Sequence, residues 1–131
     1  ADICTLIAGQ ARDVAALTAS EHLLPSMAVG GDGCVSGCSE IAPRLVHALY
    51  RACAAGDLAA ARPLQRRVAR LLKVVRFNYP VAVKYSMELM GRPAGPARRP
   101  LLPLTAAERT WVEAELAAVG VLDGEPHGWT A

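Results

Sequence analysis

The chain of 131 residues carries 14 basic and 12 acidic side chains, has a formal net charge of +2, and is 53% hydrophobic. This balance excludes intrinsic disorder, which combines low hydrophobicity with high net charge. The length allows one domain with its own core, or part of a larger one, but excludes a complete (β/α)8 barrel, which needs roughly 250 residues. No apolar run approaches the ~20 residues of a membrane-spanning helix. The four cysteines are too sparse for a disulfide scaffold, so we expect a reduced, cytoplasmic protein that is not in a membrane.

The first third of the chain alternates between strand and helix signals. We expect a short helix over residues 2–11, a buried strand over 13–19, a helix over 21–29 and a second strand over 33–36. Such a short strand–helix–strand stretch predicts a parallel βαβ unit. Two parallel strands do not stand alone in water, so the other strands of the sheet must come from elsewhere.

The helix expected over 21–29 has polar residues at its start. The Ser20 hydroxyl is suited to cap the first turn. The Glu21 carboxylate suits the positive end of the helix dipole. The glycines at positions 30 and 31 are expected to end this helix.

The chain after Pro43 is expected to be helical. Asp57 is suited to cap the second of these helices, Thr105 and Glu108 have the spacing of a capping box, and Gly120 is a typical stop. An apolar stripe at helical spacing marks the second of these helices: Ala61, Leu64, Val68, Leu71 and Val75. The predicted helices cover residues 43–54, 57–75, 80–90 and 105–119, with a loop over 91–103 and a frayed tail over 123–131.

No recognisable catalytic or metal-binding motif is present. Cys34 and Cys38 form a single close pair, whereas zinc ribbons use two pairs, so we predict no metal site. The three histidines are scattered, and no phosphate-binding loop opens a helix. The only lysines, Lys73 and Lys84, fall in predicted helices and not at strand ends, where a barrel enzyme places a catalytic amine. We expect no cofactor.

A basic face runs along the helix predicted over 57–75, opposite its apolar stripe. Such a face can form the electrostatic footprint of a nucleic-acid site. The whole chain is only +2 and has few aromatic residues for stacking, so a solvated helix face is the simpler interpretation. Nucleic-acid binding through the Arg62–Arg76 face stays as an alternative; its residues are Arg62, Arg66, Arg70 and Lys73, with Arg67 and Arg76 close by.

Four consecutive blocks of the chain resemble the dihydrodipicolinate synthase / N-acetylneuraminate lyase family. They occur in the order and with the spacing of that family, and the resemblance covers residues 2–122. The blocks are EHLLPSMAVGGDGCVSG from Glu21, P-x6-Y-x-A-x3-G-D-x2-A-A from Pro43, P-x3-K-x6-G from Pro80 and R-x-P-L-x-P-L from Arg98.

The resemblance implies a (β/α)8 TIM barrel followed by an α-helical domain, assembled into oligomers. Members form a Schiff base between a lysine on the sixth strand and pyruvate or a related 2-oxo acid. They then make or break a carbon–carbon bond or dehydrate a sugar acid, with the protonated imine as the electron sink.

Aligned in this way, the chain begins after the sixth strand. Residues 1–55 would be the last βα units, around strands seven and eight, residues 56–122 the C-terminal helical domain and 123–131 a tail. The Schiff-base lysine, a proton-shuttling tyrosine and a carboxylate-binding loop would lie outside this chain. It would need a chain or segment that supplies barrel strands 1–6, and alone it would be inactive.

The resemblance places five residues beside a small 2-oxo acid substrate. Val35 matches the position on strand eight that touches the bound acid, and Ser39 follows that strand. Thr18, Ala19 and Ser20 stand at the end of strand seven, where the family carries a glycine before an acidic or polar pair. This replacement would narrow the pocket floor, and it favours the alternative of a non-catalytic relative that uses the helices after Pro43 for assembly.

Overall fold

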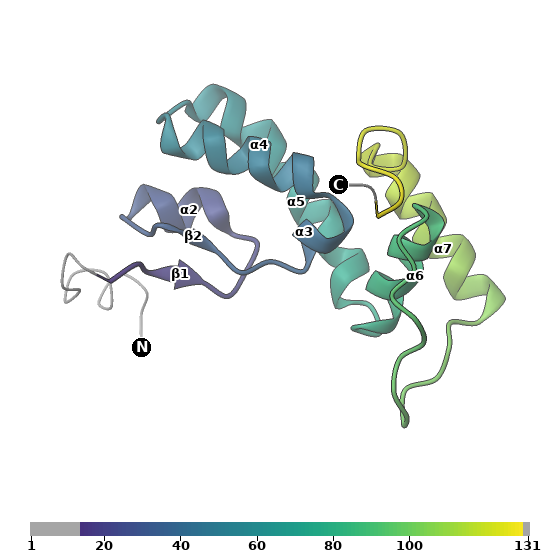
Figure 1. Ribbon diagram of the computed structural model, residues 1–131. Coiled ribbons are helices and arrows are strands. Elements are labelled where there is room, and N and C mark those ends of the chain that lie inside the picture. The colour runs from purple at the N-terminus through teal and green to yellow at the C-terminus, as the bar shows by residue number, and fades with distance from the viewer. Residues whose placement is uncertain (1–13, 130–131) are drawn as a thin grey trace.

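Two short strands and six helices follow one another along residues 14–129, the part of the chain that the computed structural model describes (Figure 1). The helix expected over 2–11 lies outside these residues. None of the described helices has the length and apolar character needed to span a bilayer. The elements are β1 (Leu17–Thr18), α2 (Leu23–Ala28), β2 (Gly33–Cys34), α3 (Cys38–Ile41), α4 (Pro43–Ala54), α5 (Leu58–Arg76), α6 (Val81–Leu89) and α7 (Ala106–Val119).

Strands β1 and β2 are parallel and joined through α2, which confirms the predicted βαβ unit. Leu17 pairs with Gly33, and Thr18 pairs with Cys34. Both strands are shorter than the expected ranges of 13–19 and 33–36. A ladder forms only where two strands face each other, and in the described part of the chain each strand has a partner on one side only.

The start of α2 differs from the expectation. Its N-cap residue is His22, which makes no side-chain capping bond, and the Ser20 hydroxyl only accepts a bond of 3.4 Å from the His22 N–H. The Leu24 N–H in the first turn donates instead to Gln65 Oε1 on α5, at 2.9 Å. The Gln65 amide also donates to the Glu21 carbonyl, at 2.7 Å. A distant side chain therefore holds this helix end.

Helix α5 carries the core. The predicted apolar stripe is confirmed, with four of its five residues buried and Leu64 half-buried against the core. Leu72 and Val74 add to the buried face. Asp57 Oδ1 accepts from the Ala60 N–H at 2.9 Å, so it caps α5 as expected. Every other described helix packs against α5.

The last two helices also follow their local signals. Gly91 has a φ of +68°, a conformation that favours glycine, directly after the C-cap of α6. Thr105 and Glu108 form the predicted reciprocal capping box on α7, and Gly120 ends that helix with a φ of +72°.

The expectation of a frayed tail over 123–131 is wrong for its described part. Glu125 is buried, and its carboxylate accepts the N–H groups of Arg44 at 2.8 Å and Leu45 at 2.9 Å. These are two of the unpaired N–H groups in the first turn of α4. The Gly128 N–H donates to the Met90 carbonyl at 2.9 Å. The segment folds back because it caps a helix about 80 residues earlier in the chain.

The turn after β2 passes very close to the end of α5. A Cβ added to Gly37 would lie 2.8 Å from Val75 Cγ1, within the range where neighbouring atoms must shift. The Gly37 N–H donates to Glu21 Oε1 at 3.1 Å. Gly37 therefore permits the strand unit to pack against the helical part of the chain.

We predict that Gly37→Ala lowers the free energy of unfolding by about 1–3 kcal/mol, because the new methyl group overpacks a buried contact. Urea unfolding followed by circular dichroism measures the change. Val75→Ala in the same chain removes the clashing methyl group, so the double variant should lose less than the sum of the two single variants. Strict additivity would contradict the proposed contact.

We predict that Glu125→Gln lowers the free energy of unfolding by about 1–2 kcal/mol, because a charge-assisted cap on α4 becomes neutral. Asp123→Asn, a neighbouring exposed acid, is the matched control and should change stability by less than about 0.5 kcal/mol. Equal effects of the two variants in urea unfolding would show that the Glu125 cap contributes nothing.

Candidate functional site

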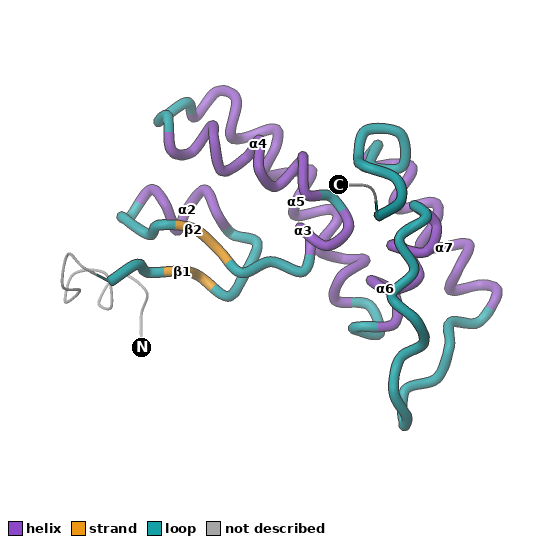
Figure 2. The backbone as a smooth tube through the Cα atoms, in the orientation of Figure 1, coloured by secondary structure: helices purple, strands orange, loops and turns teal. Residues whose placement is uncertain are grey.

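The carboxyl ends of β1 and β2 lie side by side (Figures 1 and 2). Because the strands are parallel, the residues that follow them meet at one edge, where ligands bind in parallel α/β sheets. Thr18 is the last residue of β1, and Val35 follows β2 with its N–H donating to the Thr18 carbonyl at 2.9 Å. Thr18, Ala19, Ser20 and Val35 are therefore neighbours in space.

Two hydroxyl groups at the end of β1 bond to each other. Thr18 Oγ1 and Ser20 Oγ are 3.2 Å apart, and both residues are half-buried. Ala19 between them is exposed. This turn offers a pair of hydroxyls, each able to donate or accept a hydrogen bond.

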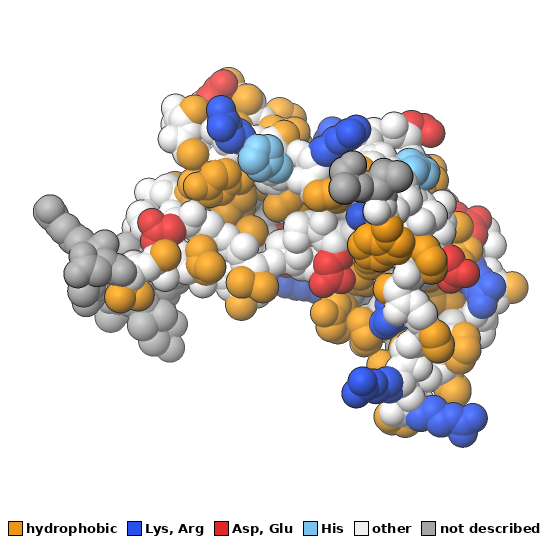
Figure 3. All heavy atoms as spheres, in the orientation of Figure 1, with side chains coloured by type: hydrophobic (Ala, Val, Ile, Leu, Met, Phe, Trp, Pro, Cys, Tyr) orange, Lys and Arg blue, Asp and Glu red, His pale blue; other side chains and the backbone are white. Residues whose placement is uncertain are grey.

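Two apolar side chains at the strands are largely exposed. Figure 1 shows α2 and α4 on the same side of the strands. Leu17 pairs with Gly33, and it also lines a cavity together with His47 and Tyr50 of α4. The exposed fraction of the side chain is 56% for Leu17 and 67% for Val35. Figure 3 shows apolar side chains open to solvent over this part of the molecule.

Ser39 lies apart from the other four predicted site residues. Its hydroxyl donates to the Ser36 carbonyl at 2.6 Å, while Ser36 Oγ accepts the Cys38 N–H at 3.1 Å. These bonds organise the start of α3, a helix that sequence reasoning missed. Ser39 lines a cavity of about 390 Å³ between β2 and α4, together with His47 and Tyr50. Leu17 of β1 also lines that cavity, whereas Thr18, Ala19, Ser20 and Val35 do not.

Glu21 is a buried carboxylate at the strand ends that sequence reasoning assigned only to the helix dipole. It precedes the N-cap of α2, and it binds the Gly37 N–H after β2. It therefore links the turns that follow the two strands. The available signal was its position: an acid directly after a predicted strand end.

The cysteines near this edge are unreactive in character. Burial, followed by the charge of Glu21, raises the pKa values of Cys38 and Cys34, so both thiols stay protonated at neutral pH. Cys34, Cys38 and Cys53 are free thiols. Within residues 14–129, no three His, Cys, Asp or Glu side chains are grouped so as to hold a metal ion.

The basic face of α5 is partly used for packing. Arg67 donates to the Val119 carbonyl at the end of α7, with its shorter bond at 3.0 Å. Arg70 Nε lies 3.0 Å from Glu115 Oε2. Two of the six basic residues thus hold α7, which weakens their assignment to nucleic-acid binding.

The comparisons with known proteins agree on one family. The Dihydrodipicolinate synthetase family matches residues 12–119. A 4-hydroxy-tetrahydrodipicolinate synthase from Chlorobaculum parvum is 36% identical over 125 residues, which cover 92% of this chain and 41% of that protein. One from Moorella thermoacetica is 39% identical over 100 residues, which cover 76% of this chain and 34% of that protein.

Solved structures show the same likeness. Dihydrodipicolinate synthase from Aquifex aeolicus superposes with a TM-score of 0.82 at 26% identity, covering 91% of this chain and 41% of that one. A dihydrodipicolinate synthase from Bacillus anthracis gives 0.84 at 29% identity, covering 89% and 42%. The described elements thus have the fold of part of a TIM-barrel protein, and the chain spans about two fifths of the length of its relatives. The chain belongs to the dihydrodipicolinate synthetase family.

Proposed function

We propose that this chain forms the C-terminal part of a Schiff-base lyase that acts on pyruvate or a related 2-oxo acid. A chain or segment bearing the first six barrel strands would complete it. The observation that carries the proposal is the parallel pair of β1 and β2, which has no third strand in the described part of the chain and at which Leu17 and Val35 are more than half exposed. Two parallel strands with exposed apolar side chains are typical of an incomplete sheet. The match to only 41% of the first relative is consistent with a missing part.

The lysines of this chain are unsuited to form the imine. Lys84 lies on α6, and its ammonium donates to the carbonyls of Ala94 at 2.6 Å and Gly95 at 3.3 Å. Lys73 is exposed in the last turns of α5. Neither follows a strand, where the substrate would bind. The Schiff-base lysine and the proton-shuttling tyrosine would come from the completing part.

The residues of this chain would shape one wall of the site. Val35 would offer an apolar surface to the bound 2-oxo acid, and the hydroxyls of Thr18 and Ser20 would offer hydrogen bonds beside it. Ser39 would stay behind this wall, held by Ser36. Glu21 would keep the two turns at a constant separation through its bond to Gly37.

The hydroxyl pair at the end of β1 favours a second candidate, a family member that assembles but does not catalyse. Thr18 or Ala19 stands where the family resemblance places a glycine, so the added side chain would narrow the space for substrate. The alternatives differ in one measurable property, because only an enzyme traps pyruvate covalently once the barrel is complete.

We predict that the isolated chain self-associates, because exposed apolar side chains at unpaired strand edges recruit a partner. Sedimentation velocity on the chain alone should show dimers or larger species. A Leu17→Lys/Val35→Lys variant should shift the distribution toward monomer, whereas Leu58→Lys, an exposed leucine at the start of α5, should not. A folded monomer of the unmodified chain would contradict the prediction.

We predict that a chimera restores imine formation. In it, this chain replaces the matching stretch of the Chlorobaculum parvum relative, which supplies all the unmatched sequence. Incubation with pyruvate and borohydride should give a reduced adduct on a lysine of the relative's portion, located by peptide mass spectrometry. The isolated chain should give no adduct.

Two controls make this experiment decisive. Lys84→Ala should leave trapping by the chimera unchanged, and the unmodified relative should show full trapping. A folded chimera that traps no pyruvate would support the non-catalytic alternative. An adduct on Lys73 or Lys84 of the isolated chain would overturn the proposed division of roles.

A further inference from the structure

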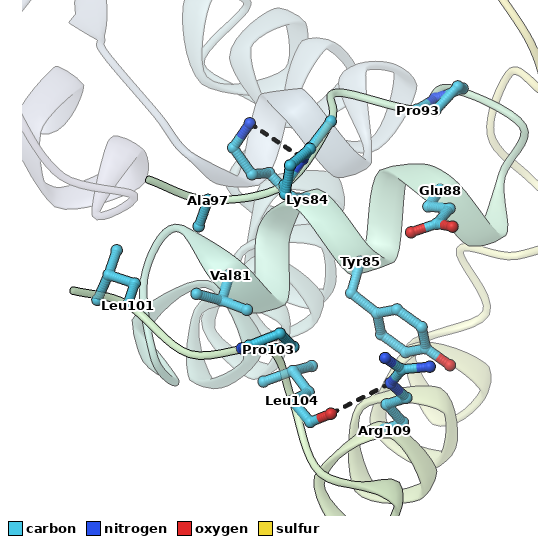
Figure 4. Close-up of a pocket in the computed structure, with 12 residues that line it drawn as sticks. Val81, Lys84, Tyr85, Glu88, Pro93, Ala97, Leu101, Pro103, Leu104 and Arg109 are labelled. Carbon is cyan, nitrogen blue, oxygen red and sulfur yellow. Dashed lines mark hydrogen bonds between the residues drawn. The ribbon is translucent and has the colours of Figure 1, made fainter. Parts of the chain in front are cut away.

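A second cavity, of about 350 Å³, lies between α6, the loop over residues 92–104 and the first turn of α7 (Figure 4). None of the five predicted site residues lines it. Its volume falls within the range of small-molecule sites, which are mostly apolar with a few oriented polar groups.

The walls of this cavity are apolar and stiff. Val81 on α6 faces Leu101 and Leu104 across the cavity, and the rings of Pro93, Pro96 and Pro103 also line it. Proline fixes its own φ angle, so a loop with prolines at these positions has few alternative conformations. A cavity with such walls is formed before a ligand arrives.

Two cations hold the ends of the loop. The Lys84 ammonium donates to the Ala94 and Gly95 carbonyls near the start of the loop. Arg109 Nε donates to the Leu104 carbonyl at its end, at 3.3 Å. These bonds place both positive charges at the cavity, and Glu88 is the only acid among the lining residues.

Arg109 has hydrogen-bonding capacity left after this bond. Its guanidinium carbon lies 5.3 Å from the centre of the Tyr85 ring, which orients the group by a cation–π contact. The Tyr85 hydroxyl donates to Glu113. In the described part of the chain, the two terminal nitrogens of Arg109 have no acceptor. Arg109 is exposed, and a guanidinium whose two terminal nitrogens are available matches the two oxygens of a carboxylate.

We propose that this cavity binds a small carboxylic acid with an apolar body. The carboxylate pairs with the terminal nitrogens of Arg109, and the apolar body lies between Val81 and the proline-lined loop. Among the lining residues, Lys84 and Arg109 are positively charged and Glu88 is negatively charged, which favours an anionic ligand. The apolar lining residues favour a ligand whose body is apolar. This site does not depend on completion of the barrel, since all of its residues belong to this chain.

The test uses the full chain with hydrocinnamate and, as a neutral probe of the same shape, hydrocinnamamide. Saturation-transfer NMR detects contact, and equilibrium dialysis measures Kd. Hydrocinnamate should bind about tenfold more tightly than the amide, because only the acid gains a charge-assisted pair. Arg109→Gln should abolish this preference. Arg62→Gln, an exposed arginine on α5 that does not line the cavity, should retain it.

A second variant tests the apolar half of the site without removing a charge. Ala97 lines the cavity, so Ala97→Phe should fill it and weaken both probes. Circular dichroism verifies that each variant keeps its helices. Equal affinity for acid and amide, a preference that survives Arg109→Gln, or no binding of the acid to the unmodified chain would each overturn the proposal.

Discussion

The packing of α5 is the interaction on which the rest of the described structure depends. Its apolar stripe lies at the centre of the core, and each of the five other helices contacts it. Its polar residues also form hydrogen bonds to other helices. Gln65 accepts a bond from the first turn of α2, and Arg67 donates to the end of α7. One amphipathic helix therefore sets the position of the strand unit relative to the last two helices. A change that weakens this stripe would affect both the strand ends and the cavity beside α6.

The second constraint is that the described part of the chain holds only two strands of a parallel sheet. A parallel strand pair normally has both faces buried, because its connections pass over them as helices. Here α2 and α4 lie on the same side of the strands, and Leu17 and Val35 are more than half exposed. Among the described residues no third strand pairs with either of them, which explains why both strands are short. It also explains why the residues expected at one substrate site do not enclose a cavity. The exposed strands and the proposed function are both consistent with the proposed completing chain or segment.

The two candidate sites, at the strand ends and in the cavity beside α6, differ in how many of their walls this chain supplies. At the strand ends it supplies a wall, with Glu21 joining two turns through Gly37. Beside α6 it supplies apolar walls and two cations that hold the loop ends. The first site would become concave with the proposed completing part, whereas the second is already concave in this chain.

The sequence by itself determined the helices whose ends are capped locally. Pro43–Ala54 has the predicted bounds, and Asp57, the Thr105–Glu108 box and Gly120 act where their spacing indicated, because a local cap involves residues only a few positions apart. The parallel strand pair and the family were also predictable from local patterns. The five candidate site residues came from the family resemblance, and the structure brings four of them together.

Only the tertiary structure decided the contacts between distant segments. Glu125 caps α4 from the far end of the chain, Gln65 replaces Ser20 at the start of α2, and Gly37 gives room for Val75. The cavity beside α6 forms because Lys84 and Arg109 bind carbonyls of the loop between them. A sequence pattern indicates which backbone groups need a hydrogen-bond partner. When several side chains could be that partner, the packing of the helices and strands determines which side chain comes within hydrogen-bonding distance.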